Sequence, residues 1–566
     1  MEKIWLEQYE PGVPQSIDYP QKSLYQMFQE SAETYKNNPA VHFMGKDLSY
    51  QELQSQVKSL ASALSEMGVK KGDRVAVHLP NSTQFPIAFF ATLAIGAIVV
   101  PFNPLYVARE MEYQLKDSGA ETIITLTRFY NMVKEVQPKT DVKNVIVSNI
   151  KDYFPGFLGF LYTVAKEKKE GDRVSISGED YSFTDLISKH SGKEPPHVEL
   201  APEDRAVYLY TGGTTGVSKG AILQHRNLVA NSLQVKAWCT DFQDGKEVVL
   251  GVLPFFHSYG LTTILNLGLL NGAKLVLLPR FELEMVLKTI DKQKPTLFPG
   301  VPTIYVAINN APNLEKYDIE SIRICISGAA PLPVEVQQEF EKNTGGKLVE
   351  GYGLTETSPV THANPVYGKG KPGSIGLPMP DTEYKIVDVE TGETEVPIGE
   401  VGEICLKGPQ VMEGYLNRPE ETAHALRDGW FYTGDIAKAD DEGYAYIVDR
   451  KKDMVIAGGF NIYPRDIEEV LYAHPKVMEA AVAGIRDPYR GETLKAYIVL
   501  KEGEAITEDE IIQYCKDNLA PYKVPKLVEF KDELPKTMIG KVLRRMLREE
   551  EEKKMQGEEK EGEEKE

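Results

Sequence analysis

Short apolar runs alternate with helical patterns over most of this chain, and this alternation constrains its fold most. Apolar residues recur at helical spacing in some stretches, while others are brief apolar runs typical of buried strands. Helices are predicted at Leu24–Tyr35, Tyr50–Met67, Ile87–Ile95 and Glu110–Ser118, and strands at Arg74–Leu79, Ala97–Phe102, Thr122–Leu126, Ala206–Tyr210 and Ile322–Ser327. Repeated strand–helix units predict an α/β fold with mostly parallel sheets and helices on both faces.

The length of the chain predicts more than one domain. At 566 residues it exceeds the size at which a single hydrophobic core keeps growing. Because the sequence changes character near Asp449, we predict a large N-terminal domain (1–448), a hinge (449–453) and a small C-terminal α+β domain (454–548). In the latter, strands are predicted at Ala480–Ile485, Leu494–Leu500 and Leu527–Phe530, and a helix at Glu508–Leu519. The tail 549–566 is almost only Glu and Lys and is predicted to be a helix that frays into disorder.

Charge and cysteine content narrow the classes of function. The formal net charge of −20 argues against a nucleic-acid partner, because phosphates would repel the chain. The cysteines (Cys239, Cys325, Cys405 and Cys515) are far apart and have neither metal-ligand nor disulfide spacing. The N-terminus lacks a secretory pattern, so a reducing cytoplasm is the expected location.

The segment Phe85–Phe102 carries no charge and is long enough to suggest a membrane span. Pro86 and Pro101 bracket it, however, and Gly96 interrupts it. A buried helix followed by a buried strand is therefore predicted.

A loop rich in hydrogen-bond donors follows the predicted strand Ala206–Tyr210. Glycines there allow positive φ and close approach of a ligand to the backbone, while hydroxyls and one lysine add donors, which together favour phosphate binding over an ordinary surface turn. These residues are Thr211, Gly212, Gly213, Thr214, Thr215, Gly216 and Lys219. The loop is not the common nucleotide P-loop, because the sequence contains no Gly-Lys-Ser/Thr.

Further blocks follow in order along the chain. Small residues after the strand Ile322–Ser327 leave room for a flat ring against the backbone. In Gly351–Thr357, an aromatic ring, a hydroxyl and a carboxylate are suited to a base, a phosphoryl oxygen and Mg²⁺, although a carboxylate also suits a first helical turn. The blocks are Pro254–Gly260, Gly328–Leu332, Gly351–Thr357, Tyr432–Asp435, Asp449–Asp453 and Pro535–Lys541.

Together with the loop, these blocks resemble the adenylate-forming superfamily, which includes acyl-CoA synthetases, adenylation domains of peptide synthetases and firefly luciferase. The likeness is strongest to long-chain fatty-acid–CoA ligases. It departs from the usual loop at Gly212, where Ser or Thr is common, and at Ser218, where Pro is common. The resemblance implies ATP, Mg²⁺ and CoA as ligands and a mobile C-terminal domain.

The resemblance also implies a role for each matching residue. Adenine would be surrounded by Gly328, Ala329, Ala330, Gly351, Tyr352 and Gly353, and the ribose would be bound by Asp435 and Arg450. Thr355 would bond phosphate, Glu356 would hold the metal, and Lys541 would be catalytic. The acyl pocket would be bordered by His257 and Gly260, the pivot would be Lys452, and the pantetheine arm would be faced by Gly458 and Gly459. A cation at Lys541 makes physical sense, because carboxylate attack on the α-phosphorus builds charge between two anions. His257 would equally suit a packed core position.

The stretch Tyr153–Ala165 is crowded with aromatic and aliphatic residues, and Lys166, Lys168 and Lys169 follow it. It is either an insertion packed on its own domain or an apolar patch with a basic rim for a membrane surface or lipid entry. Long-chain relatives often carry an apolar insertion near this place, which favours the second interpretation and a location at the inner membrane face.

The predicted function is ATP-dependent activation of a long-chain fatty acid through an acyl-adenylate, followed by thioester formation with CoA. Medium-chain or aryl acids, a carrier-protein acceptor, a luciferase-like oxygenase and a non-catalytic nucleotide-binding protein remain alternatives. A hydrolase is not favoured, since His257-Ser258 lies outside any Gly-x-Ser-x-Gly elbow. The sequence leaves the oligomeric state open, a homodimer included.

Overall fold

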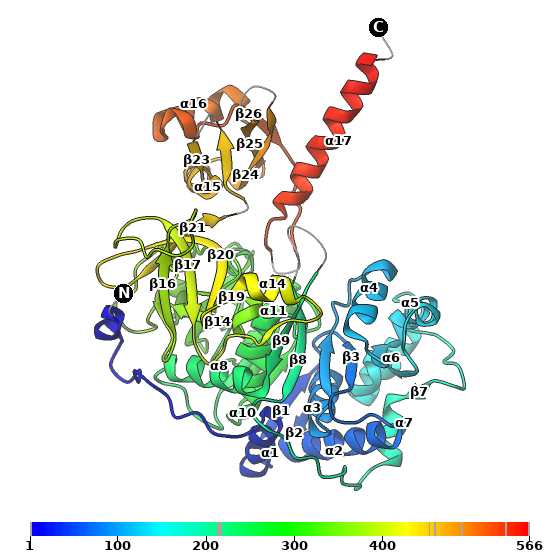
Figure 1. The fold of residues 1–566 in the computed structure, drawn as a ribbon. Helices are drawn as coiled ribbons and strands as arrows, with labels where there is room; N and C mark the ends of the chain where they lie inside the picture. The colour runs from blue at the N-terminus through cyan, green and yellow to red at the C-terminus, as the bar shows by residue number, and fades with distance from the viewer. Residues whose placement is uncertain are drawn as a thin grey trace.

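The structure is a computed structural model that describes residues 3–211, 218–451, 453–457, 460–487, 491–537 and 540–563. Figure 1 shows a large body formed by the first part of the chain and a smaller unit formed by its C-terminal part. The predicted α/β class is confirmed: helices and partly parallel sheets alternate through the large body.

The largest sheet has eight strands and carries the donor-rich loop. Its order is β18 (Gly414–Tyr415), β9 (Gly220–Gln224), β8 (Arg205–Tyr210), β4 (Ile98–Pro101), β3 (Arg74–His78), β5 (Thr122–Leu126), β6 (Asn144–Ser148) and β7 (Tyr181–Ser182). From β8 to β7 all pairings are parallel, as predicted, whereas β8–β9 and β9–β18 are antiparallel. The loop therefore joins two hydrogen-bonded neighbours at one side of the sheet.

Four helices of this first part match the predicted ones: α1 (Leu24–Thr34), α2 (Tyr50–Glu66), α3 (Gln84–Ala94) and α4 (Ala108–Ser118). The structure adds α5 (Tyr130–Val136), α6 (Gly156–Ala165) and α7 (Phe183–Lys189), which were not predicted as helices. Ser23 and Ser49 form capping boxes that fix the starts of α1 and α2. Every residue of α3 and of β4 is buried, so the uncharged segment is a core helix and strand as predicted.

Further strands place the site residues. A sheet of β10 (Val248–Gly251), β11 (Lys274–Leu277), β1 (Pro39–Phe43) and β2 (Lys46–Ser49) is linked through bridges at Leu297 to one of β12 (Ile324–Ser327), β13 (Lys347–Gly353), β14 (Val360–Ala363) and β15 (Leu377–Pro378). Between them run α8 (His225–Trp238), α9 (Ser258–Gly260), the π-helical turn η5 (Leu261–Asn266), α10 (Leu267–Leu270), α11 (Leu283–Gln293), α12 (Pro302–Asn309) and α13 (Val334–Thr344).

One sheet of the large body is antiparallel throughout. It comprises β16 (Glu383–Val387), β17 (Gly402–Lys407), β20 (Trp430–Ala439), β19 (Leu426–Arg427) and β21 (Ala445–Arg450), and all its pairings are antiparallel. Its strands are mostly joined by short connections, with only α14 (Pro419–Ala425) as an intervening helix, so the crossovers that parallel strands need are missing among these elements.

The small unit has its own core. Its strands are β22 (Val455–Ala457), β23 (Phe460–Ile462), β24 (Val477–Asp487), β25 (Gly491–Leu500) and β26 (Leu527–Phe530), and its helices are α15 (Pro464–Tyr472), α16 (Glu508–Asn518) and α17 (Arg544–Glu563). Val455, Ile467, Val482 and Ile498 belong to a cluster separate from the large core. α17 includes residues 549–563 of the charged tail, and there Lys554 Nζ lies 2.9 Å from Glu529 Oε2. Among the described residues, no helix is both long and apolar enough to cross a membrane.

Candidate active site

Three of the predicted nucleotide residues form one cluster. Tyr352 lies near the end of β13, and Asp435 and Arg450 are register partners on β20 and β21. The Tyr352 hydroxyl donates to Asp435 Oδ2 at 2.6 Å, and Arg450 Nε lies 3.2 Å from Asp435 Oδ1. Antiparallel pairing and the end of another strand thus converge on a single carboxylate that is 4% exposed.

Burial and charge keep Tyr352 protonated and Arg450 positive. Burial, followed by the Asp435 charge, raises the pKa of Tyr352, so the phenol remains a donor at neutral pH. The Asp435 carboxylate raises the pKa of Arg450, which stays positive. The buried negative charge of Asp435 is therefore paired and hydrogen-bonded, as a buried carboxylate requires.

The glycines around Tyr352 are required by packing. A Cβ at Gly351 would lie 2.8 Å from Ile326 Cγ2, and one at Gly353 would lie 2.0 Å from the Pro359 carbonyl oxygen. Any side chain at Gly353 would force β13 away from the following segment. The Gly-Tyr-Gly order thereby fixes where the Tyr352 ring sits.

Gly328 is required by packing on one side. A Cβ at Gly328 would lie 2.9 Å from the Tyr259 ring, so a protein ring occupies the place of a side chain there. Tyr259 donates to the Ile326 carbonyl at 2.5 Å, which holds it there. Ala329 has a φ of +68° and is exposed, and Ala330 is half-buried, so these two residues are the accessible part of the block.

Glu356 lies in a short 3₁₀ turn, η7 (Thr355–Thr357), beside the half-buried Thr355. The Tyr415 hydroxyl donates to Glu356 Oε1 at 2.8 Å. Within the described ranges, no group of three or more His, Cys, Asp or Glu side chains is arranged for a metal. One carboxylate nevertheless fits Mg²⁺, which keeps several waters and commonly shares one or two carboxylates with substrate phosphates.

Tyr415 was missed by the sequence analysis. It belongs to β18 and pairs with Ala221 of β9, so it enters the site from the edge of the eight-stranded sheet. Its ring lies 5.3 Å from Lys219 Nζ, while its hydroxyl holds Glu356. No motif marks Tyr415, and its contact with Glu356 spans 59 positions of sequence.

The donor-rich loop is described only at its ends. Thr211 N donates to Lys219 O at 2.9 Å, and Tyr113 donates to Ser218 O at 2.8 Å. Lys219 Nζ lies 4.0 Å from Glu421 Oε1. The predicted phosphate ligands Gly212, Gly213, Thr214, Thr215 and Gly216 lie outside the described residues.

The hairpin of Lys541 reaches the large domain. Thr537 N donates to Lys541 O at 2.9 Å, and Lys536 and Val542 form a β-bridge. A Cβ at Gly540 would lie 3.0 Å from Thr303 Oγ1 at the start of α12. The small unit therefore rests with this hairpin against the large one.

His257 lies close enough to Lys541 for their charges to interact. Its Nδ1 accepts the backbone N–H of Tyr259 at 3.2 Å, which caps α9. Burial, together with the Lys541 charge, lowers the pKa of His257 to about 4. The imidazole is therefore neutral near pH 7, and a neutral ring is compatible with an apolar ligand beside it.

Gly260 lets the backbone fold tightly beside His257. A Cβ there would lie 2.5 Å from the Pro254 carbonyl oxygen. The following turn, η5, is buried throughout, and Thr262 donates to the Ser358 carbonyl at 2.5 Å. This apolar run therefore adjoins the Glu356 segment. Lys452, Gly458 and Gly459, expected at the hinge and the CoA side, lie outside the described residues.

The apolar stretch Tyr153–Ala165 divides into two parts. Tyr153 and Phe154 are buried, and Phe154 packs on Phe43. α6 itself buries no residue, and Phe157 and Val164 are 76% and 71% exposed. Both sequence interpretations thus describe part of it: the start packs on its own domain, and the helix presents an apolar surface.

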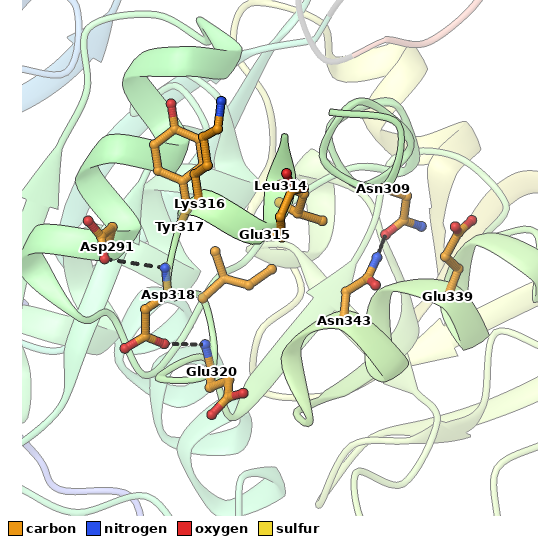
Figure 2. Close-up of a pocket in the computed structure, with 11 residues that line it drawn as sticks. Asp291, Asn309, Leu314, Glu315, Lys316, Tyr317, Asp318, Glu320, Glu339 and Asn343 are labelled. Carbon is orange, nitrogen blue, oxygen red and sulfur yellow. Dashed lines mark hydrogen bonds between the residues drawn. The ribbon is translucent and has the colours of Figure 1, made fainter. Parts of the chain in front are cut away.

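An open pocket also lies on the large body, and Figure 2 shows its lining. None of the predicted site residues lines it. Two of its acidic side chains hold the local chain: Asp291 Oδ1 accepts the N–H of Asp318 at 3.3 Å, and Asp318 Oδ1 accepts that of Glu320 at 3.2 Å.

Comparison with known proteins matches most of the chain. Residues 28–416 match the AMP-binding enzyme family, and residues 466–541 match the AMP-binding enzyme C-terminal domain. A protein named long-chain-fatty-acid–CoA ligase from Bacillus subtilis (strain 168) is 48% identical over 551 residues, which cover 97% of this chain and 98% of that protein.

Solved structures agree in fold. ATP-bound MatB from Rhodopseudomonas palustris has a TM-score of 0.81 at 32% identity, covering 93% of this chain and 99% of that one. Apo MatB from the same organism, also 32% identical, has a TM-score of 0.72, covering 94% and 99%. By TM-score, this chain is therefore more similar to the ATP-bound structure than to the apo structure. By sequence and by fold, this chain belongs to the AMP-binding enzyme family.

Proposed function

We propose that this protein is a long-chain-fatty-acid–CoA ligase that works through an acyl-adenylate. The observation that carries the proposal is the Tyr352–Asp435–Arg450 cluster, with Glu356 in the η7 turn that follows β13 and the Lys541 hairpin resting on the large domain. The name of the B. subtilis relative, at 48% identity over nearly its whole length, supports the choice of substrate class.

The cluster supports binding of the nucleoside part of ATP. Among the described residues, Tyr352 donates to Asp435 Oδ2 and Arg450 lies near Oδ1, and a carboxylate oxygen can accept more than one hydrogen bond, so a ribose diol can donate to both oxygens. Arg450 balances the charge, and the Tyr352 ring offers a face to adenine beside Ala329 and Ala330. These residues bind and orient the nucleotide, and none of them exchanges a proton with it.

The first half-reaction makes the acyl-adenylate. A carboxylate oxygen of the fatty acid attacks the α-phosphorus of ATP, the bond to the bridging oxygen breaks, and pyrophosphate leaves. Lys541 supplies positive charge between the two anions, Thr355 bonds a phosphoryl oxygen, and the loop from Thr211 to Lys219 holds the outer phosphates. Mg²⁺ held at Glu356 would neutralise phosphate charge.

The second half-reaction transfers the acyl group. The CoA thiolate attacks the carbonyl carbon of the mixed anhydride, the bond to the phosphate oxygen breaks, and AMP leaves. For this step the small domain rotates about Lys452, which withdraws Lys541 and brings Gly458 and Gly459 to the pantetheine arm. The contact of Gly540 with Thr303 and the greater likeness to ATP-bound MatB support the adenylating arrangement for the present structure.

The acyl chain follows the apolar run after Gly260. Neutral His257 borders its entrance, and the buried η5 turn continues it. Each buried methylene contributes about 0.8 kcal/mol, so chain length governs affinity.

The test is turnover across saturated acids from acetate to stearate with ATP, Mg²⁺ and CoA. We expect acyl-CoA formation to be greatest with the long acids. Pyrophosphate release without acyl-CoA formation would indicate that the acyl acceptor is a carrier protein and not CoA. Greatest activity with short or aryl acids would reject the long-chain assignment.

We also propose that α6 rests on the membrane surface from which such acids come. Phe157, Phe160 and Val164 present an apolar face, with exposed Lys166 and Lys168 beside it. Sedimentation with anionic vesicles tests this: Phe157→Ser with Phe160→Ser should release the protein, whereas Tyr367→Ser, at an exposed aromatic residue elsewhere, should not. Equal sedimentation of both variants would reject the proposal.

A further inference from the structure

Arg544, the first residue of α17, lies among three carboxylates. Its Nη2 lies 2.5 Å from Glu468 Oε2, and its Nε donates to Glu468 Oε1 at 3.1 Å. Its Nη1 lies 3.4 Å from Asp453 Oδ2 and 3.7 Å from Asp449 Oδ1. One guanidinium is thus the shared partner of all three acidic side chains.

These carboxylates lie on both sides of the expected pivot, Lys452. Asp449 belongs to β21 of the large domain, Asp453 follows the pivot position, and Glu468 belongs to α15 of the small domain. Asp449 Oδ2 also accepts the backbone N–H of Arg465 at 2.9 Å. Asp449 is therefore a large-domain carboxylate held by two groups of the small domain.

Burial makes this arrangement depend on Arg544. The side chains of Asp449, Asp453 and Glu468 are 2%, 13% and 11% exposed. Arg548 adds a weaker contact, 3.8 Å from Asp453 Oδ1. Without Arg544, little-exposed carboxylates would face one another without their main counter-charge, and loss of one partner of a buried ion pair is costly.

Arg544 is also tied to the hairpin of Lys541. Only two residues separate them in sequence, and Leu543 N donates to Pro535 O at 2.8 Å, which closes the hairpin just before Arg544. Rotation about the pivot would leave Asp453 and Glu468 with Arg544 but would carry it away from Asp449. The Arg544–Asp449 pair is therefore the part of the cluster that senses domain orientation.

We propose that Arg544 is a positioning residue that latches the small domain in the orientation in which Lys541 serves adenylation. The inference rests on the proposed two-step reaction. Arg544 touches no substrate; it acts by holding the Lys541 hairpin through Asp449, and rotation for thioester formation releases the pair.

The test compares the two half-reactions in Arg544→Ala. Pyrophosphate release with fatty acid and ATP reports the first, and acyl-CoA formation from supplied acyl-adenylate reports the second. We expect adenylation to fall about tenfold or more and thioester formation to stay within about twofold of the unaltered protein. Arg544→Lys, which keeps the charge without the fork, should recover part of the adenylation rate.

Two further variants complete the design. Arg545→Ala is the matched control, because Arg545 is the adjacent, exposed residue and pairs with Glu549 in its own helix. It should leave both half-reactions unchanged. Asp449→Asn keeps an acceptor for the Arg465 N–H and removes the charge that Arg544 meets, so it should show the same selective loss even where Arg544→Ala folds poorly.

Equal loss of both half-reactions in Arg544→Ala and Asp449→Asn would overturn the latch and leave a structural role alone. Adenylation equal to that of Arg545→Ala would overturn it as well. Failure of the proposed function is a different result, since the unaltered protein would then form no acyl-adenylate.

Discussion

The nucleotide cluster and the Lys541 hairpin are built in different ways, although the proposed reaction needs both. Tyr352, Asp435 and Arg450 come from strands of the large domain and are joined by direct contacts of 2.6 and 3.2 Å. Lys541 belongs to another domain, and the Gly540 of its hairpin rests on Thr303 of the large domain. The first is fixed by strand register, whereas the second depends on how two domains sit.

This difference separates binding from catalysis. A nucleotide must stay bound through both half-reactions, so its ligands belong on a rigid sheet. A cation that is needed in one half-reaction can be carried by a part that moves. A residue that acts through the sheet should affect both half-reactions when it is changed. A residue that acts through the domain orientation should affect only one.

The largest effect is expected for Asp435→Ala. It removes the proposed ribose acceptor and leaves Arg450 without its partner, so nucleotide affinity should fall about a hundredfold or more, for ATP and acyl-adenylate alike. Both half-reactions would be measured under subsaturating nucleotide. A loss confined to adenylation would show that Asp435 acts only in the orientation that brings Lys541 to the site, and it would contradict the distinction between the sheet residues and the hairpin. Tyr352→Phe, which removes one donor to Asp435 and keeps the ring, should show a smaller loss in both.

Glu350 lies in the large domain, but the pKa of its carboxyl group depends in part on charges of the small domain. It is a buried residue of β13, and burial raises its pKa to about 7, opposed mainly by Arg465 of the small domain and by the Leu332 N–H, while Glu469 raises it slightly. The folded protein therefore holds a proton there that the unfolded chain releases near its ordinary pKa of 4.5. The free energy of unfolding should fall as pH rises from that value to about 7.

Glu350→Gln should remove this pH dependence. Its advantage over the unaltered protein in urea unfolding should grow between about pH 4.5 and pH 7, by at most about 3 kcal/mol. Parallel stability curves for the two proteins would show that Glu350 titrates as an ordinary carboxyl group.

A smaller effect is expected for Tyr415→Phe. The ring beside Lys219 stays, but Glu356 loses the donor that orients it, so the Mg²⁺ concentration for half-maximal adenylation should rise about tenfold. Thioester formation from supplied acyl-adenylate, which uses no outer phosphates, should change little. An unchanged Mg²⁺ requirement would argue against Glu356 as a ligand of the metal.

The sequence predicted the parts of the fold that repeat. Helical spacing and short apolar runs located α1, α2, β3 and β5 within a residue or so, because local periodicity carries that information. The antiparallel sheet of β16, β17 and β20 was not recognised, since its strands lack the intervening helices that announce parallel units.

The site was predictable where motifs carry it and not where contacts cross the fold. Blocks in the chain pointed to Tyr352, Asp435 and Arg450. Tyr415 and Arg544 carry no motif, and their contacts with Glu356 and Asp453 span 59 and 91 positions. Gly328 shows a further limit: its missing side chain makes room for the ring of Tyr259, a contact that no motif indicated.

The most direct test of the central claim is Lys541→Ala, measured in both half-reactions. If the cation arrives with the small domain for adenylation alone, pyrophosphate release should fall by about a hundredfold or more, and acyl-CoA formation from supplied acyl-adenylate should persist near the unaltered rate. Equal loss of both half-reactions would contradict the account, because Lys541 would then belong with the fixed residues of the sheet.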